Sequence, residues 1–189
     1  MKKTIIYTAS LLVAFSTLQG CKKGEEDPGL SLRSRKARLT GEWTVTSYAA
    51  KEFEDGALYY SQTLEGASLK DIDGDLVAFS QDFTFEKDGT YSSTQIEDGV
   101  TTTYKGNWAF LGKSKSAELK KKEAILLDET SSTNPTYSST HSNFADGYAM
   151  AYEIVKLSNK EIIMKYNIAV KDSDLTNYSE ELTITLTKK

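Results

Sequence analysis

Short runs in which apolar and polar residues alternate make up much of the chain after residue 39. Residues 77–85 place four apolar side chains on one face in period two, and only the polar Gln81 interrupts that face. Residues 162–168 and 182–186 alternate in the same way. Such alternation is typical of a β-strand that buries one of its faces, and long helical patterns are absent. The sequence therefore predicts an all-β protein.

Turn residues separate these runs. Asp-Gly pairs at 88–89 and 98–99 predict hairpin turns, because both residues accept the positive φ angles of a tight turn. Gly106 indicates a close approach or a bulge, and the change of phase at Val155 indicates a bulge. Strands are expected at 41–46, 77–85, 91–96, 101–111, 125–127, 148–157, 162–168 and 182–186, with a ninth at 58–60 if that segment pairs.

About eight antiparallel strands in a meander can close into a barrel or pack as a β-sandwich, and alternation fits both architectures. Three connections look longer than hairpins need, at residues 50–75, 112–122 and 129–147. Long loops on a β scaffold are frequent binding sites. With only one cysteine, Cys21, the domain has to be stable without a disulfide, and its length allows a sufficient core.

Residues 1–20 have the parts of an export signal. Lys2 and Lys3 give a positive start, residues 5–15 are mostly apolar, and small residues follow. The apolar run is shorter than the ~20 residues that span a bilayer. We therefore expect a signal peptide at 1–20. Without the two lysines the formal net charge changes from −4 to −6, which disfavours nucleic acid as a partner.

The signal ends in Leu18, Gln19, Gly20 and Cys21, which resemble the lipobox of bacterial lipoproteins. The resemblance implies cleavage before Cys21, a thioether from its sulfur to diacylglycerol, and a fatty acyl chain such as palmitate on its amino group. The expected location is the outer membrane, with the protein held by lipid. The alternative is an ordinary signal with an unrelated cysteine.

Residues 21–38 are expected to form a lipidated flexible tether before a domain at 39–189. The run from Lys23 to Asp27 is similar to the acidic export signal of surface lipoproteins in the Bacteroidota, which would place the protein on the cell surface. An acidic spacer is the alternative. A small basic cluster follows, and we expect it to be solvated: Arg33, Arg35, Lys36 and Arg38.

The run from Leu39 to Trp43 resembles the Gly-x-Trp start of lipocalins. An Asp-Gly hairpin, the run from Lys105 to Trp108 and three closing strands follow in a similar order. Together these features resemble the lipocalin-like (calycin) domains of Bacteroidota lipoproteins and imply a barrel over about residues 39–187. The resemblance gives Trp43 the role of a large inward side chain at one barrel end, with its indole N–H hydrogen-bonded.

Candidate chemistry is sparse. The run from Asp71 to Asp75, with Asp82, resembles the start of a calcium loop, but acidic turn residues explain it better. His141 is the only histidine, and no nucleophile and orienting partner can be assigned to it. The carboxylate pairs at 25–26, 172–174 and 180–181 suggest no acid–base pair. We therefore expect no catalytic residues, metal or cofactor.

Two hypotheses for function remain. The first is a binding protein that holds a small apolar ligand inside the barrel. The second is a structural or interaction lipoprotein whose barrel is filled and whose loops bind protein or glycan. The inward aromatic residues that would fill it are Trp43, Phe83, Phe85, Tyr104, Trp108 and Phe110. In the second case the tyrosines of the long loops, Tyr59, Tyr60 and Tyr137, could stack on sugar rings, although Tyr59 could equally pack beneath its loop.

Overall fold

The computed structural model describes residues 27–28, 33–115, 120, 123–140, 149–171 and 177–189. Within these ranges it has one short helix, α2 (Arg35–Leu39), and eleven strands. The strands are β1 (Gly41–Glu54), β2 (Ala57–Glu65), β3 (Ser68–Asp71), β4 (Leu76–Phe85), β5 (Thr90–Glu97), β6 (Val100–Phe110), β7 (Ala124–Thr133), β8 (Ser138–Thr140), β9 (Ala149–Leu157), β10 (Glu161–Lys171) and β11 (Asn177–Lys188).

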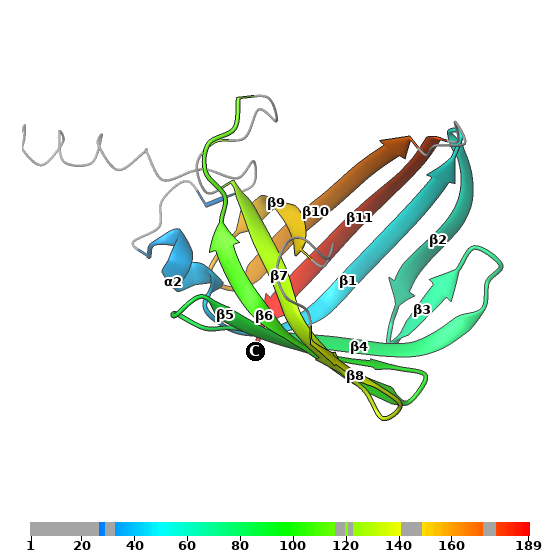
Figure 1. The fold of residues 1–189 in the computed structure, drawn as a ribbon, viewed down its shortest axis with the longest axis horizontal. Coiled ribbons are helices and arrows are strands. Elements are labelled where there is room, and N and C mark those ends of the chain that lie inside the picture. The colour runs from blue at the N-terminus through cyan, green and yellow to red at the C-terminus, as the bar shows by residue number, and fades with distance from the viewer. Residues whose placement is uncertain (1–26, 29–32, 116–119, 121–122, 141–148, 172–176) are drawn as a thin grey trace, which may run out of the picture.

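All the strands belong to one antiparallel sheet, in the order β6-β5-β4-β3-β2-β1-β11-β10-β9-β7-β8. An additional pairing between β6 and β7 closes the sheet into a ten-stranded barrel with β8 as an extra strand (Figure 1). The predicted all-β antiparallel barrel is confirmed, and the barrel is closed rather than an open sandwich. Closure leaves few unpaired sheet edges.

The barrel has more strands than the sequence indicated, because two of the expected loops contain strands. Segment 50–75 holds the end of β1 and all of β2 and β3, and segment 129–147 contains the end of β7 and all of β8. Asp55 and Gly56 join β1 to β2 with φ angles of 48° and 81°, the same conformation as Asp98 and Gly99 at 48° and 77°. The Asp-Gly turn predicted at 98–99 is confirmed, whereas the equivalent signal at 55–56 was missed.

Strand β1 changes partner along its length. At its start, Gly41–Thr44 pairs with Asp82–Phe85 of β4, and from Ala49 onward it pairs with β2 instead. The β2–β3 pair therefore separates β1 from β4 at only one end of the barrel. Eight strands surround the end where β1 begins, and β2 and β3 are added toward the other end.

Both predicted irregularities are present. The register between β9 and β10 shifts so that Val155 has no partner on β10, which is the bulge indicated by the change of phase. The register between β6 and β7 shifts at Gly106. A Cβ atom on Gly106 would lie 2.1 Å from the carbonyl oxygen of Asp128 and 2.7 Å from a ring carbon of Tyr91. Glycine is therefore required there by close packing.

The last part of the expected tether packs onto the barrel. Ser34 caps α2 by accepting a hydrogen bond from the backbone N–H of Ala37 at 3.1 Å. Arg35 and Arg38 are only 5% and 1% exposed, so the prediction of a solvated basic cluster is wrong for these two residues. Earlier in the chain, Asp27 is 3% exposed and forms ion pairs with both arginines.

Candidate ligand-binding cavity

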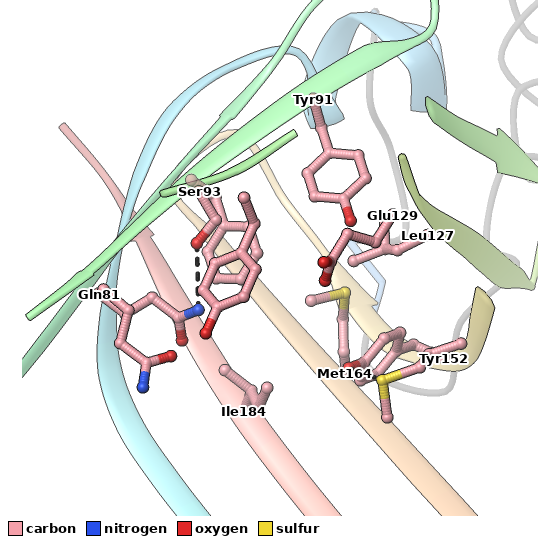
Figure 2. Close-up of a pocket in the computed structure, with 12 residues that line it drawn as sticks. Gln81, Tyr91, Ser93, Leu127, Glu129, Tyr152, Met164 and Ile184 are labelled. Carbon is pink, nitrogen blue, oxygen red and sulfur yellow. Dashed lines mark hydrogen bonds between the residues drawn. The ribbon is translucent and has the colours of Figure 1, made fainter. Parts of the chain in front are cut away.

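The interior of the barrel is divided into a packed end and a hollow. The hollow is a cavity of about 170 Å³. Its lining comes from β4, β5, β6, β7, β9, β10 and β11, and Figure 2 shows side chains from opposite strands pointing into the same space. The lining residues are Gln81, Phe83, Tyr91, Ser93, Gln95, Tyr104, Leu127, Glu129, Met150, Tyr152, Met164 and Ile184.

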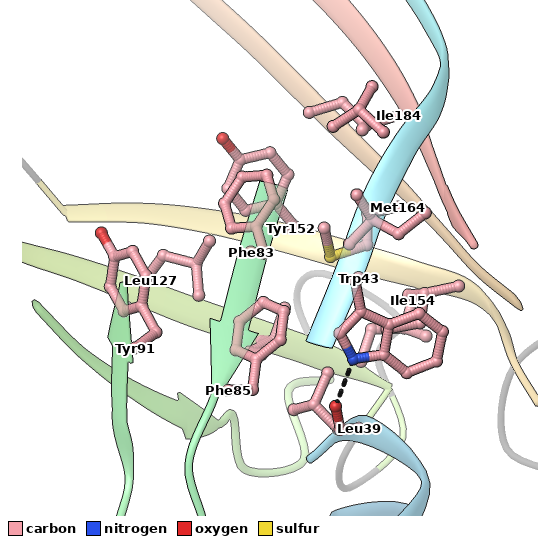
Figure 3. Close-up of a cluster of buried hydrophobic side chains, with 14 of the residues drawn as sticks. Leu39, Trp43, Phe83, Phe85, Tyr91, Leu127, Tyr152, Ile154, Met164 and Ile184 are labelled. Atoms are coloured by element: carbon pink, nitrogen blue, oxygen red, sulfur yellow. Dashed lines mark hydrogen bonds between the residues drawn. The ribbon is translucent and has the colours of Figure 1, made fainter. Parts of the chain in front are cut away.

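The packed end lies below the cavity and depends on Trp43 (Figure 3). This side chain is fully buried, and its indole N–H donates a hydrogen bond to the carbonyl oxygen of Leu39 at 2.7 Å. The predicted inward position and hydrogen bond of Trp43 are confirmed. Phe85 stacks on Phe83 at 5.9 Å between ring centroids and meets Trp108 edge-on at 6.3 Å. These aromatic contacts close one end of the barrel.

The floor and the apolar wall of the cavity are buried. Phe83, Leu127, Tyr152 and Ile184 are 5–7% exposed, and Met164 is 1% exposed. These residues lie on five different strands and are held together because each is the inward member of its alternating pair. The apolar lining of the cavity is therefore continuous with the hydrophobic core of the barrel.

The remaining wall is polar. The amide of Gln81 donates to the hydroxyl of Ser93 at 3.0 Å, and Ser93 is only 2% exposed. The amide of Gln95 donates to Glu97 at 2.8 Å. In Figure 2 the side chains of Glu129 and Tyr91 reach the cavity from β7 and β5. A ligand in this cavity therefore meets hydrogen-bonding groups along one wall and apolar groups along the other.

Carboxylates continue along the inner face toward the open end. Glu97 pairs with Phe79, and Glu180 lies directly opposite Glu52 across the β1–β11 ladder. Partial burial raises the pKa of Glu180, and the charge of Glu52 adds to the shift. Burial raises the pKa of Tyr48 to about 12, and Glu180, Glu97 and Glu52 contribute to the same shift. Three carboxylates, those of Glu52, Glu97 and Glu180, therefore lie on the inner face at the end of the barrel away from Trp43.

Neutral tyrosines lie in the field of carboxylates. Burial raises the pKa of Tyr91, and the next largest cause is the charge of Glu129. Burial also raises the pKa of Tyr104, with contributions from Glu129 and Glu97. Burial is the main cause for Tyr152 as well. All three phenols remain protonated at neutral pH. Tyr91 and Tyr104 can donate hydrogen bonds to a ligand, whereas the hydroxyl of Tyr152 donates to the sulfur of Met150.

Most of the candidates from the sequence are outside the part of the chain that the structure describes. Leu18, Gln19, Gly20 and Cys21 are outside the described residues, as are His141 and the carboxylate pairs at 25–26 and 172–174. Among the described residues, no group of three or more His, Cys, Asp or Glu side chains could hold a metal ion. No helix in the described part of the chain is long and apolar enough to cross a membrane.

The run from Asp71 to Asp75, which resembles the start of a calcium loop, forms the end of β3 and the turn before β4. A carboxylate oxygen of Asp71 accepts hydrogen bonds from the backbone N–H groups of Asp73 and Asp75 at 3.0 and 2.9 Å. Asp82 lies in β4 and accepts from Thr44 at 2.7 Å and Lys189 at 2.6 Å. These contacts support the interpretation of the run as acidic turn residues.

The three candidate tyrosines do not form one surface. Tyr59 lies on β2 and not beneath a loop; it is 46% exposed and its hydroxyl donates to Glu52. Its ring centroid is 6.3 Å from that of Tyr178. Tyr137 is 48% exposed at the turn between β7 and β8. Tyr60, also on β2, is half-buried.

Sequence reasoning assigned no residue to a ligand site, although one signal was present. Gln81 interrupts an otherwise apolar inward face, and the structure places it in the polar wall of the cavity. Ser93 and Glu129 gave no comparable signal, because each belongs to a polar run. Of the aromatics expected to fill the barrel, Phe83 and Tyr104 instead line the cavity, while Trp43, Phe85 and Trp108 pack the closed end.

No protein-family model matches the chain, and no curated protein gives a significant sequence match. The class of the protein therefore rests on its fold. It is a closed antiparallel β-barrel, compatible with a lipocalin-like binding protein.

Proposed function

We propose that the protein is a lipid-anchored, non-catalytic lipoprotein whose lipocalin-like barrel binds a small molecule. The cavity of about 170 Å³ carries this proposal, because it lies inside the barrel and combines buried apolar groups with polar side chains. Ligand sites in proteins commonly have this composition. The volume is below the ~300 Å³ at the lower end of typical pockets, so the ligand, or the part of it that enters, is small.

The residues at 18–21 support the anchor, and the position of Asp27 indicates how such an anchor would orient the barrel. At most about 3.6 Å per residue, the six residues from Cys21 to Asp27 span no more than about 22 Å. Asp27 contacts Leu157 and Arg38 at the packed end of the barrel. A lipid on Cys21 would therefore hold the packed end near the outer membrane and direct the open end of the barrel away from it.

Native mass spectrometry of the purified full chain tests the binding function. We expect a small molecule that is retained in the native spectrum and lost on denaturation. Ser93→Leu fills the cavity and should abolish retention, whereas Ser92→Leu, on the opposite face of the same strand, should not. A clean apo mass, together with an unchanged melting temperature across a panel of single-ring compounds, would contradict the proposal.

The anchor is tested separately by feeding cells an alkyne analogue of palmitate. The wild-type chain should incorporate the label and fractionate with the outer membrane, and Cys21→Ser should lose the label. Incorporation that persists in Cys21→Ser would exclude this residue as the attachment point. Protease treatment of intact cells would then distinguish surface display from a periplasmic orientation, since only a surface protein is cleaved.

A second candidate function is binding of a protein or glycan by the hairpins. One observation favours it: large apolar side chains beside the turns are more than two-fifths exposed, namely Leu58, Tyr59, Ile72, Leu76, Ile96 and Val100. Crosslinking on intact cells would test this function. Leu76→Lys should reduce a specific crosslink and leave retention of a cavity ligand unchanged, because Leu76 does not line the cavity.

A further inference from the structure

We infer that the cavity selects a small organic cation, an ammonium group attached to a body about the size of one ring. This inference rests on the proposed binding function and specifies the chemistry of the ligand. It follows from the size of the cavity, from the charges that line it and from the charges that surround its entrance.

The volume of the cavity limits the size of the apolar part of the ligand. A cavity of about 150 Å³ lined by apolar side chains accommodates a benzene ring, and the cavity here has about 170 Å³. Leu127, Met164 and Ile184 provide an apolar surface for such a ring. Tyr152 and Met150 add polarizable contacts, and the hydroxyl of Tyr152 already donates to the sulfur of Met150 at 3.4 Å. A long acyl chain does not fit within this volume.

The charge of the residues that line the cavity indicates which functional group the ligand carries. Glu129 is acidic, and no lysine, arginine or histidine is among the described residues that line the cavity. Tyr91 and Tyr104 lie in the field of Glu129 and are themselves neutral. An anionic ligand would be repelled by the carboxylate, whereas a cation gains a charge-assisted hydrogen bond and the faces of nearby aromatic rings.

The side chains on the inner face next to the cavity are also negatively charged. Glu52 and Glu180 are direct cross-strand neighbours, an arrangement that destabilises a sheet because like charges repel. Glu97 lies on the inner face of β5, one inward position beyond Gln95. Glu52 also accepts hydrogen bonds from the hydroxyls of Tyr59 and Tyr178, so it has a structural role as well. Together with Glu180 it adds negative charge to the inner face, and this charge attracts cations.

Three compounds of nearly equal size test this inference without any change to the protein: benzylamine, benzyl alcohol and benzoate. Binding to the purified full chain is measured by calorimetry at neutral pH. We expect benzylamine to bind about ten- to a hundredfold more tightly than benzyl alcohol, the range for a charge-assisted hydrogen bond, and benzoate to bind least.

Two variants test whether Glu129 causes the preference for a cation. Glu129→Gln should remove most of the difference between benzylamine and benzyl alcohol while keeping the affinity for benzyl alcohol. Glu153→Gln makes the same change in net charge at an exposed position outside the cavity, and it should leave the difference intact. If Glu129→Gln does not fold, the comparison of the three compounds on the wild-type chain still decides the question.

The outcomes separate the two proposals. Equal affinity for all three compounds, or tighter binding of benzoate, overturns the cationic preference and leaves the binding function in place. An unchanged preference in Glu129→Gln overturns the role of the cavity carboxylate. Absence of binding by all three compounds, with an apo mass in the native spectrum, overturns both the inference and the binding function.

Discussion

A carboxylate oxygen of Asp27 accepts a hydrogen bond at 2.7 Å from the backbone N–H of Leu157, 130 residues further along the chain. Its second oxygen is paired with Arg35 and lies 3.8 Å from Arg38, which in turn donates to the carbonyl oxygen of Leu157 at 2.7 Å. The segment that precedes the barrel is therefore attached to the end of β9. Residue 27 acts as part of the folded domain.

This contact predicts that Asp27→Ala destabilises the barrel. The substitution leaves two buried arginines without their carboxylate, and removing one partner of a buried ion pair typically costs about 3–5 kcal/mol. Several nitrogens of these guanidinium groups already have no hydrogen-bond partner among the described residues, which adds to the dependence on Asp27. Urea unfolding measures the loss. Asp73→Ala, in an exposed turn, is the control, and an equal midpoint for both variants would contradict the prediction.

Trp43 closes the end of the barrel, so Trp43→Ala should lower the free energy of unfolding by about 3–5 kcal/mol, as expected for a buried aromatic replaced by alanine. Trp43→Phe keeps much of the packing but removes the donor to Leu39. Its cost should be smaller, and it includes about 1 kcal/mol for the lost hydrogen bond. Thermal unfolding gives both values. An unchanged melting temperature for Trp43→Ala would exclude a packing role.

Gly106→Ala should destabilise the β6–β7 ladder by about 1–3 kcal/mol or more, as overpacking does in a well-packed interior. The added methyl group would overlap the backbone carbonyl of Asp128, which cannot rotate away as a side chain can. Gly112→Ala is the matched control, because no atom lies within 4 Å of the added carbon. Urea midpoints of the two variants check the prediction, and equal midpoints would count against it.

The buried tyrosines predict a loss of stability in alkali. The pKa of Tyr48 is raised to about 12 in the folded state. The unfolded chain therefore releases this proton first, near the ordinary pKa of about 10, and the free energy of unfolding falls as pH rises from there. Below pH 10 the stabilisation is fully present. For Tyr48 alone the change by pH 12 is at most about 3 kcal/mol.

Urea unfolding between pH 8 and pH 12 measures this effect. Tyr48→Phe should flatten the decrease, because phenylalanine has no proton to lose. Tyr137→Phe, at an exposed position, should leave the decrease nearly unchanged. A wild-type midpoint that stays constant up to pH 12 would show that the native state does not protect these phenols.

Alternation and turn chemistry were sufficient to predict an antiparallel all-β fold, because both depend on local sequence. They fitted a barrel and a sandwich equally, and the resemblance to lipocalins was what indicated a barrel. The bulge at Val155, the close packing at Gly106 and the inward Trp43 were each visible in the chain. The β1–β2 hairpin could also have been found, since Asp55 and Gly56 repeat the signal used at 98–99. The start of β1 was predicted, and the ninth strand expected at 58–60 if it paired is confirmed as part of β2. The full length of β2 was missed because it is half-exposed along most of its length and lacks a clear apolar face.

The cavity and the role of Asp27 could not be predicted in the same way. A cavity depends on which inward side chains fail to fill the space between opposite strands, and that requires the register of every strand around the barrel. The attachment of Asp27 to Leu157 joins residues far apart in the sequence, and no periodic pattern marks it. Gln81 alone indicated that one inward face has a polar position.

Because β1 changes partner along its length, one end of the barrel can change without disturbing the strand pairing at the other end. The ladder between Gly41–Thr44 and Asp82–Phe85 supports the packed end and does not involve β2 or β3. Lengthening or exchanging the β2–β3 hairpin would therefore alter the diameter of the open end while this ladder persists. The end of the barrel that contains β2 and β3 can therefore vary in width while the packed end keeps its strand pairing.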